Sequence, residues 1–180
     1  MTEITIENIV ASTQIADELN LNALSVSIAE SKYKPEEFPG LIVHLTEPKT
    51  AVLLFSTGKL VCTGAKKPKE IDDALHKICA KIKGTGGILH ETYDVAIQNM
   101  VASADLKTKM NLTEIAQKMG LENVEYEPEQ FPGLIYRMES LHAVMLLFGS
   151  GKLICTGVIE KDIQAAVDSM TDMLASFGVI

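Results

Sequence analysis

The chain has 180 residues and a formal net charge of −8, with 47% hydrophobic and 22% charged side chains. This composition is typical of a soluble globular protein whose core needs no disulfides, and the acidity by itself argues against nucleic acid as a partner. No apolar run has the length of a membrane span and the polar start MTEITIEN is no signal peptide, which predicts an intracellular, cytoplasmic protein.

In chain order, three stretches of the first half recur in the second half. ITIENIVAS at 4–12 matches VAIQNMVAS at 95–103, YKPEEFPGLIVHL at 33–45 matches YEPEQFPGLIYRM at 126–138, and LLFSTGKLVCTG at 53–64 matches LLFGSGKLICTG at 146–157. Two copies are too few for a solenoid and favour a pseudo-twofold pair that shares one core. We therefore expect a first repeat at 1–91 and a second repeat at 92–180, joined intimately into one unit.

Each copy is predicted to begin with a strand, followed by a helix at 21–31 or 111–120. In the second copy, Asn111 suits the N-cap and Gly120 the C-cap. A Pro-Gly loop, a hairpin and a further strand come next, and an amphipathic helix at 68–84 or 160–178 ends the copy. Strands and helices are not interleaved one for one, which favours an α+β fold with an antiparallel sheet and helices on one face.

The strands of both copies are apolar on both sides, although the helices can cover only one side. Successive strand residues point to opposite sides of a sheet. One side carries Val, Leu, Ile, Phe, Asn and Thr with almost no charge, and a large exposed apolar surface usually marks a binding site. The residues that share sides in this pattern are Ile6, Asn8 and Val10, then Leu53 and Phe55, then Val61 and Thr63, with the counterparts Ile97, Asn99, Val101, Leu146, Phe148, Ile154 and Thr156.

Two of the five Phe residues, Phe38 and Phe131, stand directly before Pro-Gly. Pro-Gly is a turn signal, so each ring is expected in a loop rather than in a core strand. Phe55 and Phe148 each follow 17 residues later, with the predicted hairpin turn midway between. Antiparallel pairing therefore sets Phe38 beside Phe55 and Phe131 beside Phe148, which predicts one aromatic pair per copy.

The repeated FPGLI loop, the LLFxxGKLxCTG segment and the NxV strand together resemble the TATA-box-binding protein family over essentially the whole chain. The chain is most similar to archaeal-type members, since it lacks a long N-terminal extension and its helix at 68–84 mixes Lys with acidic residues. The resemblance implies a saddle in which two pseudo-symmetric repeats share a ten-stranded antiparallel curved sheet. Helices would cover the convex face, and DNA would lie under the concave face.

The resemblance implies a general transcription initiation factor that binds the TATA box in the minor groove. It would bend the DNA by inserting Phe side chains, a behaviour for which this family is a standard example. An apolar sheet suits a widened minor groove, which offers few polar groups for discrimination beyond A·T against G·C. The protein would accordingly be associated with the nucleoid and need no cofactor.

The resemblance assigns roles to matched positions in the two copies. The wedges would be Phe38, Phe55, Phe131 and Phe148, on loops stiffened by Pro39 and Pro132. The hydrogen-bonding groups would be Asn8, Asn99, Thr63 and Thr156. The packing residues would be Val10, Val61, Leu53, Val101, Leu146 and Ile154. The cations facing phosphate would be Lys59, Lys152 and Arg137, and His44 stands where the second copy has Arg137.

The acidity is concentrated in the second half, which suggests a second surface. Residues 1–90 carry 10 Lys and Arg against 11 Asp and Glu, while residues 91–180 carry 6 against 13. Glu127 and Glu129 lie on the loop that, in the resembled family, receives transcription factor B, and Lys34 replaces the first of them in copy one. The implied partners are A/T-rich promoter DNA, transcription factor B and, indirectly, RNA polymerase. The sequence also allows a homodimer in the absence of DNA.

Other functions are less consistent with the sequence. GSGK at 149–152 lacks the earlier Gly of a phosphate-binding loop and precedes Leu153 rather than Ser or Thr, so we expect no enzyme. Three cysteines without a CxxC pair predict reduced, buried thiols and no metal site. The alternatives are a ligand-binding module that uses the apolar face, or a nucleic-acid-binding accessory module of the same fold.

Overall fold

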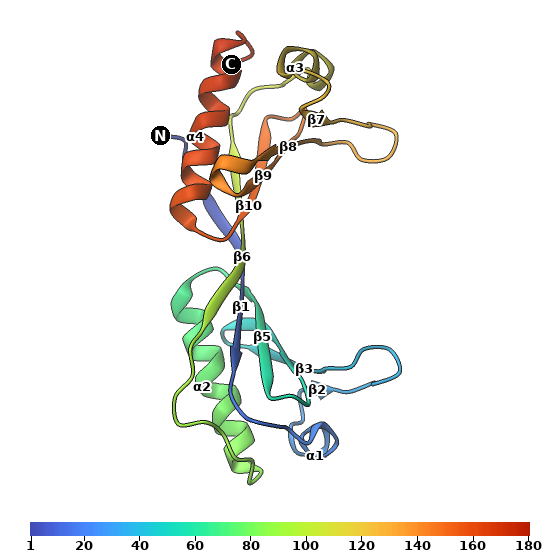
Figure 1. Ribbon diagram of the computed structural model, residues 1–180, viewed down its shortest axis with the longest axis vertical. Helices are drawn as coiled ribbons and strands as arrows, with labels where there is room; N and C mark the ends of the chain where they lie inside the picture. The colour runs from blue at the N-terminus through green and yellow to red at the C-terminus, as the bar shows by residue number, and fades with distance from the viewer. The chain divides into compact units, whose positions relative to one another are not determined.

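The computed structural model describes all residues from Met1 to Ile180 (Figure 1). Ten strands form one sheet in the order β2-β3-β4-β5-β1-β6-β10-β9-β8-β7. The chain divides into two compact units, which we call the first-repeat unit (Asn8–Gln98) and the second-repeat unit (Met1–Glu7 with Asn99–Ile180). The strand pairs within each unit are antiparallel, which confirms the predicted α+β class.

The same order of elements occurs twice along the chain. The first series is β1 (Thr5–Gln14), α1 (Leu21–Ser27), β2 (Ser31–Lys32), β3 (Leu41–Thr46), β4 (Lys49–Leu54), β5 (Lys59–Ala65) and α2 (Pro68–Gly84). The second series is β6 (Ala96–Asp105), α3 (Leu112–Met119), β7 (Val124–Glu125), β8 (Leu134–Met138), the 3-10 turn η1 (Glu139–Leu141), β9 (Ala143–Leu147), β10 (Lys152–Gly157) and α4 (Glu160–Ser176).

The core of each unit lies between the sheet and its long helix. In the first-repeat unit α2 packs on β4 and β5, and in the second-repeat unit α4 packs on β9 and β10 (Figure 1). Ile78 and Ile82 of α2 are fully buried, as are Val52 and Leu54 of β4. Burying one such side chain contributes roughly 1.5–3 kcal/mol, so this apolar layer fixes which side of the sheet faces the helix.

The helix bounds follow local hydrogen bonding. α2 spans the predicted range, and α3 has the expected N-cap, where Asn111 Oδ1 accepts from Glu114 N at 3.2 Å. The first helix was predicted to reach residue 31 but ends at Ser27. This prediction was wrong because Ser31 already belongs to β2, where it pairs with Val43. α4 likewise ends two residues before the predicted 178, where Gly178 takes φ +71.

Each unit includes the beginning of the other repeat's first strand. The second-repeat unit contains Met1–Glu7, and the first-repeat unit extends to Gln98. Thr2 N donates to Asp168 Oδ1 of α4 at 2.8 Å, so the N-terminal residues pack with the second repeat. In the first-repeat unit, Thr13 Oγ1 donates to Asp94 O at 2.6 Å. The compact units therefore differ from the stretches repeated in the sequence, because the first strand of each repeat is divided between them.

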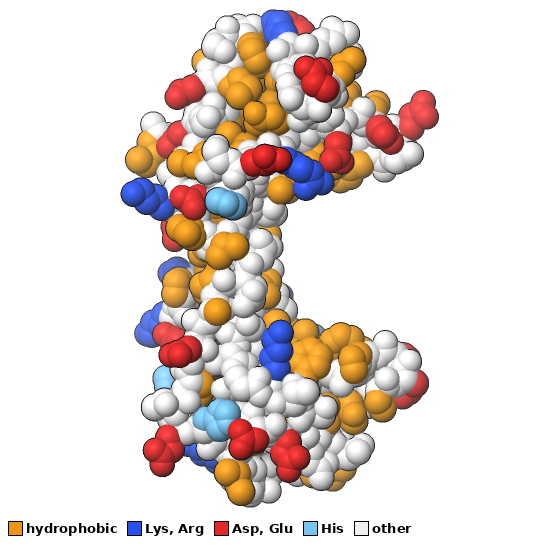
Figure 2. All heavy atoms as spheres, in the orientation of Figure 1, with side chains coloured by type: hydrophobic (Ala, Val, Ile, Leu, Met, Phe, Trp, Pro, Cys, Tyr) orange, Lys and Arg blue, Asp and Glu red, His pale blue; other side chains and the backbone are white.

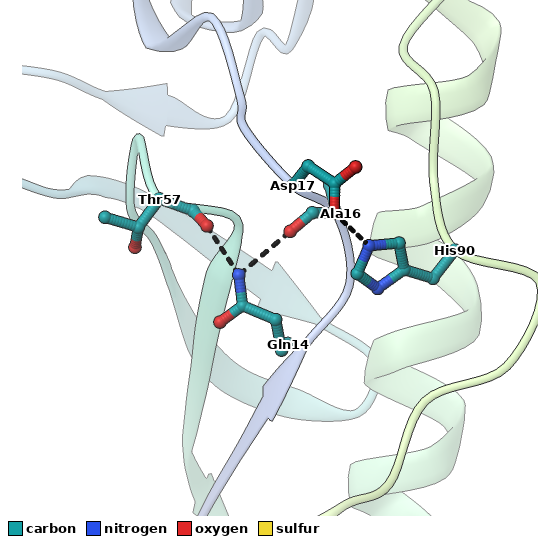
Figure 3. A network of polar contacts seen from close by, with 5 residues as sticks. All are labelled: Gln14, Ala16, Asp17, Thr57 and His90. Carbon is teal, nitrogen blue, oxygen red and sulfur yellow. Dashed lines mark hydrogen bonds and ion pairs between the residues drawn. The ribbon is translucent and has the colours of Figure 1, made fainter.

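A polar network secures the turn between β4 and β5 (Figure 3). The Gln14 side-chain amide donates to Ala16 O at 2.9 Å and also to Thr57 O. His90 Nε2 and Asp17 Oδ1 lie 2.9 Å apart and tie the segment after α2 to the same place. Gly58 has φ +87, and a Cβ there would lie 1.9 Å from Ala16 O, so only glycine fits this approach.

Candidate nucleic-acid interface

Each unit has an open face, which we define as the side of its sheet opposite α2 or α4. In β5, Leu60 and Cys62 are buried under the helix, while Val61 and Thr63 are half-buried on the other side. β10 has the same alternation. The two sides are therefore divided as the sequence predicted, because strand residues alternate with a period of two.

Strand register aligns the open-face residues in rows. In the first-repeat unit, Ile42 pairs with Leu53, Leu53 with Val61, and Val61 with Ser12. The second-repeat unit has the matching row Ile135, Leu146, Ile154 and Ser103. The residues at the ends of these rows were not predicted from the sequence; they are Ile42, Ile135, Ser12 and Ser103. Counting by two from His44, Arg137, Val10 and Val101 would have found them.

The predicted aromatic pairs are present in both units. The ring centroids of Phe38 and Phe55 lie 5.9 Å apart with an interplanar angle of 68°, and those of Phe131 and Phe148 lie 6.0 Å apart at 75°. This edge-to-face arrangement is favourable for aromatic rings. Phe131 is 38% exposed, and the other three rings are half-buried.

Glycine is required beside both Phe pairs because a side chain there would collide with the rings. A Cβ on Gly40 would lie 2.7 Å from the Phe38 ring, and one on Gly133 would lie 2.8 Å from the Phe131 ring. Backbone hydrogen bonds of 2.9 Å from Phe38 N to Lys34 O and from Phe131 N to Glu127 O hold the loops. The Pro-Gly motif therefore makes the turn and also leaves room for the ring packing.

The polar residues of the open face differ between the repeats. Gly64 N donates to Asn8 Oδ1 at 2.6 Å, and Asn8 Nδ2 donates to Thr63 Oγ1 at 3.3 Å. Asn99 and Thr156 occupy the matching half-buried positions, but Asn99 makes no hydrogen bond to Thr156 or Gly157. Asn8 is thus oriented by the protein itself, and Asn99 is not oriented in this way.

The predicted cations also have different surroundings. Lys59, Lys152 and His44 are exposed. Arg137 Nε lies 3.2 Å from Glu125 Oε1, so a carboxylate competes for the guanidinium of the second repeat. The residue matching Glu125 in the first repeat is Lys32, which adds a cation where the second repeat has an anion.

Charged side chains line part of a hollow of about 1000 Å³ on the open face of the second-repeat unit. Its lining includes Glu3, Glu7, Asp105, Lys107 and Lys152 besides Val101, Ile154 and Phe148. The expectation of an almost uncharged face is therefore wrong here. The strand pattern did not place the start of β1 beside the end of β6, and that juxtaposition brings the carboxylates together.

The two partner-binding candidates lie in the loop between β7 and β8. Glu127 and Glu129 are exposed, and Figure 2 shows acidic side chains at the tip of this loop. In the matching loop of the first repeat, Lys34 Nζ lies 3.4 Å from Glu37 Oε1. The second-repeat loop is therefore more negative, and its carboxylates are free of such an ion pair.

The cysteines are free and buried, as predicted. Burial raises the pKa of the Cys62 and Cys155 thiols to about 11, because the charged thiolate would be poorly solvated. They act as core packing residues under α2 and α4. No helix combines the length and the apolar character that crossing a membrane requires.

Comparison with known proteins identifies the fold first. The solved structure of Methanococcus jannaschii TBP matches with a TM-score of 0.87 at 43% sequence identity, covering 97% of this chain and 99% of that chain. The architecture of two repeats in a ten-stranded sheet, with one open face in each repeat, is therefore a known fold.

The sequence comparisons define the family. The family model described as "Transcription factor TFIID (or TATA-binding protein, TBP)" matches residues 3–85 and again 94–177. The TATA-box-binding protein of Picrophilus torridus is 50% identical over 181 residues, which cover 100% of this chain and 98% of the relative. That of Thermoplasma volcanium is 49% identical over 179 residues, covering 99% and 97%. The chain belongs to the TATA-binding protein family, and the expected resemblance to archaeal members is confirmed.

Proposed function

We propose that this protein is a general transcription initiation factor that binds TATA-box DNA in the minor groove and bends it. One observation carries the proposal: each unit sets an edge-to-face Phe pair beside rows of half-buried apolar residues on an open face. The names of its relatives support the same target, since each is a TATA-box-binding protein.

The apolar rows are suited to the floor of an opened minor groove. Leu53, Val61, Leu146 and Ile154 would contact sugars and base edges there, together with Val10 and Val101. Removing this apolar surface from water favours binding by roughly 25 cal/mol per Å². A smooth apolar surface distinguishes bases poorly, so selectivity would come from deformability and from the few polar groups of the face.

The Phe pairs would act as wedges at base steps. Phe38 and Phe131 would lead from their loops, which Pro39 and Pro132 stiffen, and Phe55 and Phe148 would support them by ring contact. Unstacking a step costs a few kcal/mol, and bent DNA contacts more protein surface in return, as known for this family. Gly40 and Gly133 leave the space that the paired rings occupy.

The polar contacts would complete the interface. Asn8, Asn99, Thr63 and Thr156 would hydrogen-bond to minor-groove acceptors, and a G·C pair would instead present its amino group. Lys59, Lys152, His44 and Arg137 would face phosphates. Arg137 would have to exchange Glu125 for a phosphate, because the two side chains are paired in the free protein.

A further part of the proposal concerns protein partners. We propose that Glu127 and Glu129 bind transcription factor B on bent DNA, which would bring RNA polymerase to the promoter. Their exposure and the absence of a competing cation such as Lys34 support this assignment. A cationic surface on the partner would be the complement.

The direct test is a gel shift with an A/T-rich duplex, followed by energy transfer between dyes on its two ends. We expect binding with a bend and a clear preference over a G/C-rich duplex of the same length. Equal affinity for both duplexes, or binding to straight DNA, would refute the proposal.

A further inference from the structure

Two serines of the open face have opposite hydrogen-bonding partners in the two units. In the second-repeat unit, Ser103 Oγ donates to Glu7 Oε1 at 2.6 Å. In the first-repeat unit, Gln98 Nε2 donates to Ser12 Oγ at 2.8 Å. The positions correspond, since Glu7 matches Gln98 and Ser12 matches Ser103 in the repeated stretches.

Both serines lie at the ends of the apolar rows and are half-buried. Ser12 pairs with Val61, and Ser103 pairs with Ile154. Ser103 and Glu7 also line the hollow beside Phe148. The two hydroxyls are therefore on the surface that would meet DNA.

The side chain that is hydrogen-bonded to each serine determines whether the hydroxyl can still donate to a ligand or only accept from it. A serine hydroxyl has one hydrogen to donate and two lone pairs that accept. A carboxylate only accepts, so the hydrogen of Ser103 is used by Glu7 and only its oxygen lone pairs remain. An amide can donate, so Ser12 accepts from Gln98 on one lone pair and keeps both its own hydrogen and its second lone pair.

The minor groove distinguishes these two states. A·T pairs present only the acceptors adenine N3 and thymine O2, whereas a G·C pair adds the guanine amino donor. Ser12 can donate its hydrogen to an A·T acceptor or accept from the guanine amino group on its second lone pair. Ser103 can accept from the guanine amino group but has no hydrogen left for an A·T acceptor.

We propose that the Glu7–Ser103 and Gln98–Ser12 pairs make the two half-sites unequal. The second-repeat unit gains a hydrogen bond from a G·C pair facing Ser103, while the first-repeat unit accepts either pair facing Ser12. This inference rests on the proposed minor-groove function. It gives a nearly symmetric protein a preferred orientation on any site with a G·C pair in one half.

The test uses a self-complementary A·T duplex and the pairs I·C and G·C, which differ in the minor groove only by the amino group. I·C is placed at the matching position of one half-site or both, and each is then changed to G·C. In wild type, the double change should strengthen binding by about three to ten times, the worth of one hydrogen bond at Ser103. The single change should give about half of that gain, because only one of the two orientations places the G·C pair at Ser103.

The variants exchange the partners. Glu7→Gln frees the Ser103 hydrogen, so neither the single nor the double change should now strengthen binding. The double variant Glu7→Gln with Gln98→Glu should restore the gain from the single change, with reversed orientation. A dye at the C-terminus and one at a DNA end would report that reversal by energy transfer.

The matched control is Glu3→Gln. Glu3 lines the same hollow and forms no hydrogen bond to a serine, so this variant removes the same charge without changing Ser103. We expect wild-type discrimination from it. Unchanged discrimination in Glu7→Gln, or an equal change in Glu3→Gln, would overturn the inference while leaving the proposed function intact. Failure of wild type to bind the all-A·T duplex would instead refute the proposed function.

Discussion

The two repeats are most alike where they are apolar and least alike where they are polar. Their Phe pairs have centroid distances of 5.9 and 6.0 Å, and their apolar rows match position by position. Asn8 is bonded to Gly64 while Asn99 lacks the equivalent bond, and Arg137 is paired with a carboxylate whose counterpart is Lys32. Packing needs only shape and register, whereas a polar contact needs a particular donor and a particular acceptor in the right geometry. Under the proposed function, the shared features would bend the DNA and the differences would set its polarity.

The largest expected effect tests the shared feature. Phe148→Ala should remove most of the bend at its own end and weaken binding about tenfold to a hundredfold, since a buried aromatic ring contributes roughly 1.5–3 kcal/mol. Phe55→Ala should do the same at the other end. Energy transfer across the duplex measures the bend, and Phe177→Ala at the end of α4 is the control. An unchanged bend angle in Phe148→Ala would mean that this ring is not a wedge.

The next effect tests a difference between the two loops. Glu129→Arg should abolish the complex with transcription factor B on DNA while leaving DNA binding intact, because a cation would replace the carboxylate of the proposed contact. Glu36→Arg makes the same change at the matching position of the first-repeat loop and should leave the complex intact. Gel shifts with and without the factor distinguish the two. A ternary complex that survives Glu129→Arg would contradict the assignment.

A smaller effect tests the cations. Few cations lie on the open faces, so affinity should fall less steeply with salt than for a basic groove binder. Glu125→Ala frees Arg137 for phosphate and should raise affinity in dilute salt by about twofold to fivefold, with a steeper salt dependence. Lys32→Ala should act in the opposite direction. Titrations at several salt concentrations measure both, and equal slopes in all three proteins would show that neither side chain contacts phosphate.

The smallest effect concerns stability and involves only the first-repeat unit. The hydrogen bond to Asp17 raises the pKa of His90 above its ordinary value of 6.5. The stabilisation is therefore fully present below pH 6.5 and is lost as pH rises through the raised pKa. The free energy of unfolding of wild type should exceed that of Asp17→Asn below pH 6.5, and this difference should disappear as pH rises through the raised pKa of His90. Thermal unfolding at several pH values checks this, and a pH-independent difference would exclude a role for His90.

Several elements could be predicted because they depend on local pattern. The alternation of buried and half-buried residues in β5 and β10, the limits of α2 and the caps of α3 all follow from residues close in sequence. The Phe pairs followed from one long-range argument, the symmetry of a hairpin about its turn. The predicted end of the first helix failed because β2 takes Ser31 through pairing with Val43, a tertiary contact.

The sequence by itself determined the duplication, the side of each strand that stays open and the Phe residues that form the two ring pairs. Periodicity and repeat spacing encode these features directly. Only the tertiary structure decided that Glu7 meets Ser103, that Arg137 meets Glu125 and that Asn8 meets Gly64. Each of these contacts joins residues on different strands, so its partners depend on strand order and register. The carboxylates around the hollow of the second-repeat unit became a group for the same reason, because β1 begins in one repeat and packs with the other.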